Sequence, residues 1–251
     1  MPRTMRGVLL GLLVFLPGAP VAADPIPVKF TEGVTRGFPV LRSLDGVTLA
    51  QGEFTQVPRE PDVIDSHLIF RFRDGSVHDE RVVFSQRDVF TLLSYHILQT
   101  GPSFPETIEA SVDRATGRYQ VRYRGDPDSL EERLSGDVTL PADVYNGLLS
   151  MLLKNLPDGD SRVVQIMAFT PKPRLVKMLL TPAAQDPLRV NEVRVMATRF
   201  LVRPQLGVLA ALLVTDVPDL KCWIASGEAP GFLRFEGPLY FLGPIWRIEW
   251  S

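Results

Sequence analysis

The stretch TIEASVDRATGRYQVRY, residues 107–123, decides the fold class, because it can pair with itself in only one sensible way. If residues 107–113 and 118–123 are strands joined by residues 114–117, Asp113 lies opposite Arg118. Apolar side chains then meet on one side and polar or charged ones on the other. The pairs are Val112 with Tyr119, Ala110 with Val121, Ile108 with Tyr123, Glu109 with Arg122 and Ser111 with Gln120. A shift by one residue would destroy both faces, so the sequence predicts an antiparallel sheet with one buried face.

A second hairpin is expected at residues 66–73 and 76–84, around Asp74-Gly75, which is a strong signal for a two-residue turn. In that register one face is apolar and consists of Leu68, Phe70, Phe72, Val77 and Val83. The opposite face is expected to meet water and carries His67, Ile69, Arg71, His78 and Glu80. This hairpin would thus separate core from solvent in the same way as the first.

Residues 163–169 and 175–180 form a third expected hairpin, and apolar side chains occupy both of its faces. Such a pattern is typical of strands that are covered on both sides. The 22 prolines and 19 glycines are spread along the chain, as expected for short strands separated by turns. Further strands are expected at residues 26–31, 53–57, 131–140, 190–202, 221–226, 232–236 and 245–250.

Two segments show helical spacing. In residues 142–155 apolar side chains recur every four residues from Val144, between two prolines. Residues 86–99 repeat this spacing from Val89, although residues 90–93 would also suit a strand. The sequence therefore predicts a mainly β protein: a curved antiparallel sheet or half-barrel with one or two helices packed on it. A two-sheet sandwich is the alternative.

The N-terminus has the three parts of a secretion signal. Arg3 and Arg6 precede an apolar run at residues 8–16, and Val21-Ala22-Ala23 offers the small residues that a signal peptidase recognises. We expect a signal peptide at residues 1–23 and a single mostly β domain at residues 24–251. The apolar run is roughly half of the ~20 residues that span a bilayer. The expected product is a free protein in the periplasm or outside the cell, without a transmembrane segment or a lipid anchor.

Charge and cysteine content narrow the choice of partners. The chain has 27 basic and 29 acidic residues. Removal of the expected signal peptide takes away Arg3 and Arg6, which leaves 25 basic residues and a net charge near −4. Nucleic acid is not an expected partner, because a phosphate backbone requires a clustered positive surface. Cys222 is the one cysteine in the sequence, so no internal disulfide can form, and its strand-like surroundings predict a buried, inert thiol. The core alone must stabilise the fold.

We predict no catalytic residue, no metal and no cofactor, because no motif for such a site stands out. His67 and His78 would lie four residues apart along the ladder, about 13 Å at roughly 3.3 Å per residue, which is too far to share a metal ion. His96 falls on the apolar side of the helix expected at residues 86–99 and is interpreted as a structural, partly buried histidine.

Two segments are the best candidates for ligand contact. The loop at residues 170–174 carries Lys172 and Arg174, stiffened by two prolines, directly after Phe169. Its cations can hold a phosphate or carboxylate group, or they can simply be solvated charges on a rigid turn. Residues 206–214 are almost entirely apolar and would form either a flap over the open side of the sheet or part of the core. Leu209 and Leu213 are its candidate contacts.

Three stretches resemble those of a family of exported bacterial proteins of unknown function: LPADVYNG at 140–147, TPKPRLVK at 170–177 and FEGPLY at 235–240. More remotely, the order of elements is similar to the half-barrels of lipoprotein carriers of the LolA and LolB type. The resemblance implies a periplasmic location and a curved sheet, and it supplies no catalytic residues. The long proline-rich region before Ser66 departs from the carriers, so a carrier function rests on analogy.

Three functions follow, in order of preference. The first is binding of an apolar small molecule or lipid in a cavity of the curved sheet. The second is an interaction module of the cell envelope that uses an exposed face with Trp246, Ile248 and Trp250. The third, least favoured, is a hydrolase with a site assembled from distant residues, for which His96 is the best available histidine.

Overall fold

The computed structural model describes residues 25–126, 128–157, 159–190, 192–205 and 219–250. These residues form one large antiparallel sheet of 15 strands and one short helix, α1 (Leu149–Asn155). The strands are β1 (Thr35–Gly37), β2 (Pro39–Ser43), β3 (Thr48–Glu60), β4 (Val63–Phe72), β5 (Val77–Ser85), β6 (Thr91–Thr100), β7 (Thr107–Asp113), β8 (Arg118–Arg124), β9 (Glu132–Asp137), β10 (Arg162–Thr170), β11 (Lys172–Val190), β12 (Val193–Gln205), β13 (Leu220–Ala225), β14 (Phe232–Gly237) and β15 (Trp246–Trp250).

The strands follow one another in an unbroken path, β10-β11-β12-β13-β14-β15-β2-β3-β4-β5-β6-β7-β8-β9, with β1 paired to β3. The fold class is therefore as predicted, a curved antiparallel sheet with one helix. The sandwich alternative is wrong, because all described strands belong to one sheet. That sheet is open, since its two end strands pair with different neighbours and not with each other.

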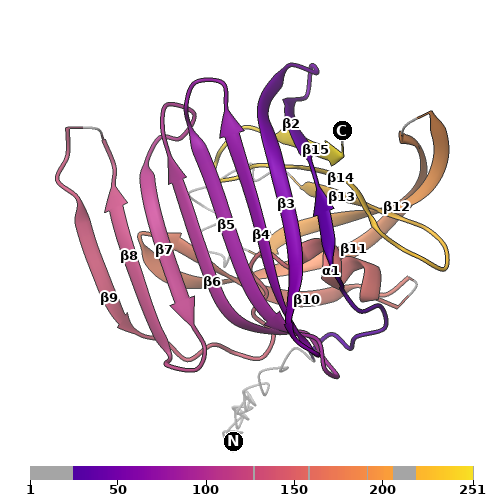
Figure 1. Cartoon of the computed structure of the whole chain (residues 1–251), viewed down its shortest axis with the longest axis horizontal. Coiled ribbons are helices and arrows are strands. Elements are labelled where there is room, and N and C mark those ends of the chain that lie inside the picture. The colour runs from indigo at the N-terminus through magenta and orange to yellow at the C-terminus, as the bar shows by residue number, and fades with distance from the viewer. Residues whose placement is uncertain (1–24, 127, 158, 191, 206–218, 251) are drawn as a thin grey trace, which may run out of the picture.

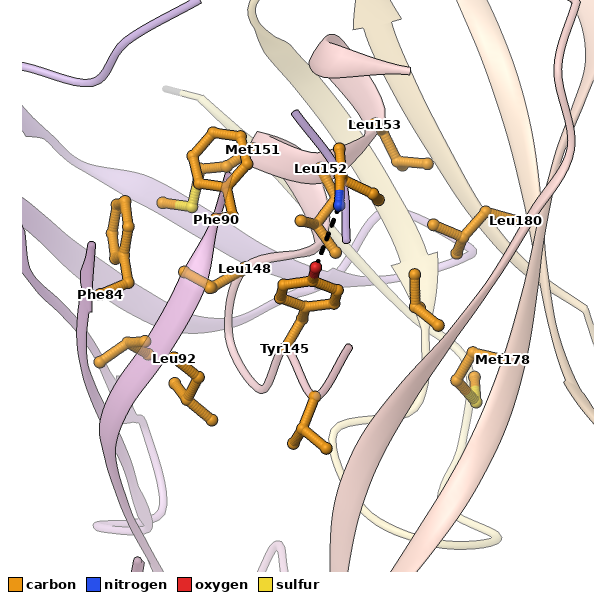
Figure 2. Packing of buried hydrophobic residues seen from close by; sticks show 14 of the residues in the cluster. Phe84, Phe90, Leu92, Tyr145, Leu148, Met151, Leu152, Leu153, Met178 and Leu180 are labelled. Carbon is orange, nitrogen blue, oxygen red and sulfur yellow. Dashed lines mark hydrogen bonds between the residues drawn. The ribbon is translucent and has the colours of Figure 1, made fainter. Parts of the chain in front are cut away.

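The sheet bends over itself and the main core lies in the bend. In Figure 1, β3 to β9 stand side by side in one broad layer, while β10 to β12 cross behind it. Figure 2 shows the packing between them: Phe84 and Leu92 of the broad layer, Leu148 and Leu152 of the α1 region, and Leu180 of β11. The loop before α1 and α1 itself thus fill the space between the two parts of the sheet.

The hairpin of β7 and β8 has the predicted register. Asp113 pairs with Arg118, and the pairs behind it follow as expected, down to Ile108 with Tyr123. Its inner side chains Ile108, Ala110 and Val121 are buried. The alternating pattern was therefore sufficient to fix this register.

The predicted register of β4 and β5 is wrong by one residue. Phe72 N donates a backbone hydrogen bond to Ser76 O at 2.9 Å, so the loop has three residues, Arg73 to Gly75. Gly75 has φ +88°, the left-handed conformation that ends such a three-residue loop. Phe70 consequently pairs with His78, and Leu68 with Glu80. Both polar side chains lie on the inner face, where the sequence predicted water.

The helix expected at residues 86–99 is wrong, because residues 91–100 form β6. A β-bulge at Leu93 explains the misleading spacing: Val83 pairs with Ser94, but Phe84 pairs with Leu92. The extra residue shifts the alternation, so that Leu92 and Tyr95, three positions apart, face the same core. That separation is also the one a helix shows.

The helix expected at residues 142–155 is only half formed. Before α1, the segment from Asp143 to Tyr145 pairs with the outer edge of β10, with Tyr145 N donating to Gln165 O at 2.9 Å. Gly147 then adopts φ +68°, which a right-handed helix does not contain. The helix therefore begins at Leu149, and the preceding residues shield the free edge of β10.

Residues 26–31 were expected as a strand but form one isolated bridge, Pro27 with Val89. Proline lacks an N–H, and two backbone bonds remain beside it, Val28 N to Asp88 O at 3.0 Å and Phe90 N to Ile26 O at 3.1 Å; side chains supply the other bonds of this segment. Ile26 N donates to the Tyr145 hydroxyl at 3.1 Å, the bond that is dashed in Figure 2. Lys29 N and Phe30 N both donate to Asn155 Oδ1 at 2.7 Å, which ties this segment to α1. The other expected strands are present with boundaries shifted by a few residues, as part of β3, β9 and β12 to β15.

Candidate cavity under the curved sheet

A cavity of about 420 Å³ lies on the inner side of the sheet. Its floor comes from β3 to β6, its opposite wall from β13 to β15, and α1 closes one side. This volume is within the range of roughly 300–1,000 Å³ that is usual for small-molecule sites. Most lining side chains are apolar; those of the floor are Phe54, Leu68, Val82 and Ile97, and those of the opposite wall include Phe232, Phe235, Ile248 and Trp250.

Four polar residues of the floor lie near one another, and we call them the polar cluster: Gln56, Ser66, Glu80 and Tyr95. The strand register places them there. Gln56 pairs directly with Ser66, and Val82 pairs with both Ser66 and Tyr95. Glu80 lies two residues from Val82 and therefore on the same face, diagonal to both neighbours. The inner face thus carries polar groups inside an otherwise apolar surface.

Glu80 and Tyr95 satisfy each other. The Tyr95 hydroxyl donates to Glu80 Oε1 at 2.8 Å. Burial raises the pKa of the Glu80 carboxyl, and the hydrogen bond from Tyr95 opposes this in part. Burial together with the Glu80 charge raises the pKa of Tyr95 well above its usual value. Burial thus disfavours the charged form of both groups, and the pair is a buried hydrogen-bonded unit in the floor.

His78 is buried and lines the same cavity. Gln99 Nε2 lies 2.9 Å from His78 Nδ1 and 2.7 Å from the carbonyl oxygen of Leu239. Since a carbonyl only accepts, Gln99 presents its NH₂ group here, and His78 Nδ1 is the acceptor. The neutral ring then carries its proton on Nε2. Burial lowers the pKa of His78 to about 4, which the charge of Asp79 opposes.

The opposite wall is aromatic. Trp250 donates its indole N–H to the carbonyl oxygen of Phe232 at 2.9 Å and lies 5.9 Å from the rings of Phe54 and Phe232. Trp246 and Ile248 are buried. The exposed interaction face expected from Trp246, Ile248 and Trp250 is therefore wrong. Cys222 is buried as predicted and lines the cavity, and burial raises the pKa of its thiol.

At the side of the cavity, Lys154 of α1 forms an ion pair with Glu32, with 2.5 Å between Nζ and Oε1. Both residues line the cavity, and their side chains are only 14% and 11% exposed. The side chain of Gln86 makes two hydrogen bonds to the backbone of Glu32. Gln86 Oε1 accepts from Glu32 N at 2.6 Å, and Gln86 Nε2 donates to Glu32 O at 2.9 Å. The cation of Lys154 is thus neutralised within the site.

Of the sequence-based contact residues, Phe169, Lys172 and Arg174 do not line this cavity. Phe169 stacks on Tyr95 at 6.3 Å between ring centroids but is not itself a lining residue. Lys172 and Arg174 are exposed on the β10–β11 turn. Leu209 and Leu213 lie outside the described residues. The sequence did not identify the floor residues for two reasons. The predicted register of β4 and β5 was wrong by one residue, and the strand expected at residues 53–57 had no predicted partner strand.

The other histidines lie on the outer face of the sheet. His67 Nε2 is 2.9 Å from Asp79 Oδ1, and His96 Nε2 is 3.4 Å from Glu109 Oε1. His96 lies on β6 rather than on a helix, and it is partly exposed. Within the described part of the chain, no group of three His, Cys, Asp or Glu side chains could hold a metal ion. No helix there has the length and apolarity that crossing a bilayer requires.

Comparisons of the chain with protein-family models, with curated proteins and with solved structures found no match. The resemblance to exported bacterial proteins and to lipoprotein carriers therefore stays a prediction.

Proposed function

We propose that this protein is exported and binds an apolar, lipid-like molecule in the cavity under its curved sheet. The cavity itself carries the proposal: about 420 Å³, lined mostly by apolar and aromatic side chains, with a few polar groups at defined positions. This combination is typical of sites that enclose small apolar ligands. Export rests on the N-terminal pattern of Arg3, Arg6 and the apolar run at residues 8–16.

A bulky substitution in the floor of the cavity tests whether the cavity binds the ligand. Ile97 lines the cavity, whereas its neighbour Leu98 points to the outer face, where it pairs with Asp79 and Glu109. Ile97→Trp should abolish the fluorescence enhancement of an apolar probe such as N-phenyl-1-naphthylamine, and Leu98→Trp should preserve it. Circular dichroism shows whether both variants are folded. Equal probe binding by wild type and a folded Ile97→Trp protein would exclude the cavity as the site.

Export and natural cargo require separate measurements. N-terminal sequencing of the protein from the producing cells should begin at Asp24, and a sequence that begins at Met1 would contradict cleavage. Native mass spectrometry of the same material should show an additional apolar mass that organic extraction removes. Consistent absence of such a mass would count against a bound ligand.

A further inference from the structure

We propose that the cavity selects an uncharged ligand with an acyl chain and an oxygen-bearing head, such as an acyl ester, and that Gln56 and Ser66 bind the head oxygen. This inference rests on the proposed function and assigns the chemistry of the ligand at that same site.

Gln56 is the residue that requires a partner. It is 2% exposed and lines the cavity, and among the described residues its buried Nε2 has no hydrogen-bond partner. A buried amide donor without an acceptor destabilises a folded protein. An ester or hydroxyl oxygen in the cavity would supply that acceptor, so the ligand would satisfy a group that the chain leaves unpaired.

Ser66 lies beside Gln56 and provides a second polar group. The two residues are direct partners in the β3–β4 ladder, and Ser66 is 4% exposed. Side chains that are paired in this way have Cβ atoms about 5 Å apart. A carbonyl oxygen has two lone pairs, and so it can accept from the Gln56 amide and the Ser66 hydroxyl together.

The charges around the cavity favour a neutral head. Lys154 is already paired with Glu32, and burial keeps His78 in its neutral form near pH 7. Glu80 lies diagonal to Ser66, and its carboxyl resists ionisation for the same reason. A carboxylate or phosphate head would find no unpaired cation among the described lining residues, and its desolvation would be uncompensated.

The acyl chain has an apolar path next to the polar cluster. Phe54 and Leu68 pair across β3 and β4 in the row next to Gln56 and Ser66. Phe232 and Phe235 face them from the opposite wall of the same cavity. A ligand with its head at Gln56 can therefore bury its chain between the floor and this wall.

Binding of three probes of equal chain length tests the inference: 1-decanoylglycerol, decanoic acid and decane, each used to displace N-phenyl-1-naphthylamine at pH 7.5. We expect 1-decanoylglycerol to bind at least tenfold more tightly than decanoic acid. Gln56→Leu should weaken the binding of 1-decanoylglycerol about tenfold and leave that of decane within twofold. Gln51→Leu, on the exposed face of the same strand, is the matched control and should change neither affinity.

The melting temperature of the protein without ligand tests the role of Gln56 independently of any binding measurement. Gln56→Leu removes the unpaired donor, so ligand-stripped protein should melt at the same or a higher temperature than wild type. Decanoic acid that binds as tightly as 1-decanoylglycerol, or a Gln56→Leu protein with unchanged affinity for the ester, would overturn the inference and leave the proposed function intact. Failure of every probe to bind wild-type protein would overturn both.

Discussion

The two faces of the strands β3 to β6 carry similar polar residues under opposite conditions. On the outer face, His67 lies 2.9 Å from Asp79, and Arg36 lies 2.9 Å from Glu53, with side chains that water reaches. On the inner face, His78 meets the amide of Gln99, and Glu80 meets the hydroxyl of Tyr95. Outside, the polar side chains meet one another in contact with water, whereas inside they are buried and bond to other protein groups.

The difference follows from the solvent. Water hydrates exposed charges whether or not they are paired, so outer ion pairs contribute little to stability. The inner groups have lost that hydration, and each must find a partner in the protein or in a ligand. Polar side chains in an inner face therefore have larger energetic effects than the same side chains outside, and substitutions on the two faces can measure this directly.

The largest contrast is expected between neighbouring residues of β4. Phe70 is fully buried on the inner face, and Arg71 is exposed on the outer face. Phe70→Ala should lower the free energy of unfolding by about 3–5 kcal/mol, because it leaves a cavity in the core. Arg71→Ala should change it by less than about 0.5 kcal/mol. Urea denaturation followed by tryptophan fluorescence measures both, and equal losses would mean that the face assignment is wrong.

The second contrast is in pH dependence. Since the pKa of His78 falls from 6.5 in the unfolded chain to about 4 in the folded protein, the unfolded chain binds more protons between these values. The contribution of His78 to the free energy of unfolding is therefore fully present above pH 6.5. It is lost as pH falls toward 4, by roughly 3 kcal/mol in total. His78→Gln should flatten this part of the stability profile. A His78→Gln profile that matches that of the wild type would refute the assignment.

A smaller effect is expected for the pair of Tyr95 and Glu80. Tyr95→Phe removes the donor to Glu80 and should cost about 1–2 kcal/mol, because the carboxyl stays buried. Glu80→Gln keeps an acceptor for the hydroxyl and removes the penalty that grows when pH rises above the unfolded pKa of a carboxyl. The double variant completes a mutant cycle at pH 7. Additive effects of the two substitutions would show that the residues do not interact.

The smallest effect belongs to the outer face. Glu53→Gln weakens the exposed ion pair with Arg36 and should cost no more than about 1 kcal/mol, with less effect at high salt. Thermal melts at low and high ionic strength measure it. A loss as large as that of Tyr95→Phe would remove the distinction between the faces.

The sequence predicted the mainly β class and the register of β7 and β8 because that hairpin is local and its alternation is uninterrupted. The prediction failed at two places where one extra residue reversed the face on which the following side chains lie. Gly75 ends a three-residue loop instead of a two-residue turn, which moves His78 and Glu80 to the inner face. The bulge at Leu93 gives β6 the spacing of a helix.

The candidate site was less predictable, because distant strands build it. β15 pairs with β2, so that Trp250 meets Pro39, and both of these residues line the cavity. No local pattern encodes a contact over that separation in sequence. Gln56 falls in a strand that was predicted, but its face depends on the pairing with β4. Even a correct list of strands would have left its position inside the cavity unknown.

The two ends of the sheet differ in a way that matters for handling the protein. The edge of β10 is covered by the residues before α1, whereas β9 ends the path with charged residues such as Glu132, Arg133 and Asp137. In Figure 1, β9 lies at the opposite side of the molecule from β13 to β15, which form the aromatic wall. We therefore expect a dye or surface tether on the β8–β9 connection to leave the cavity unobstructed, and we expect the same connection to tolerate an inserted reporter domain.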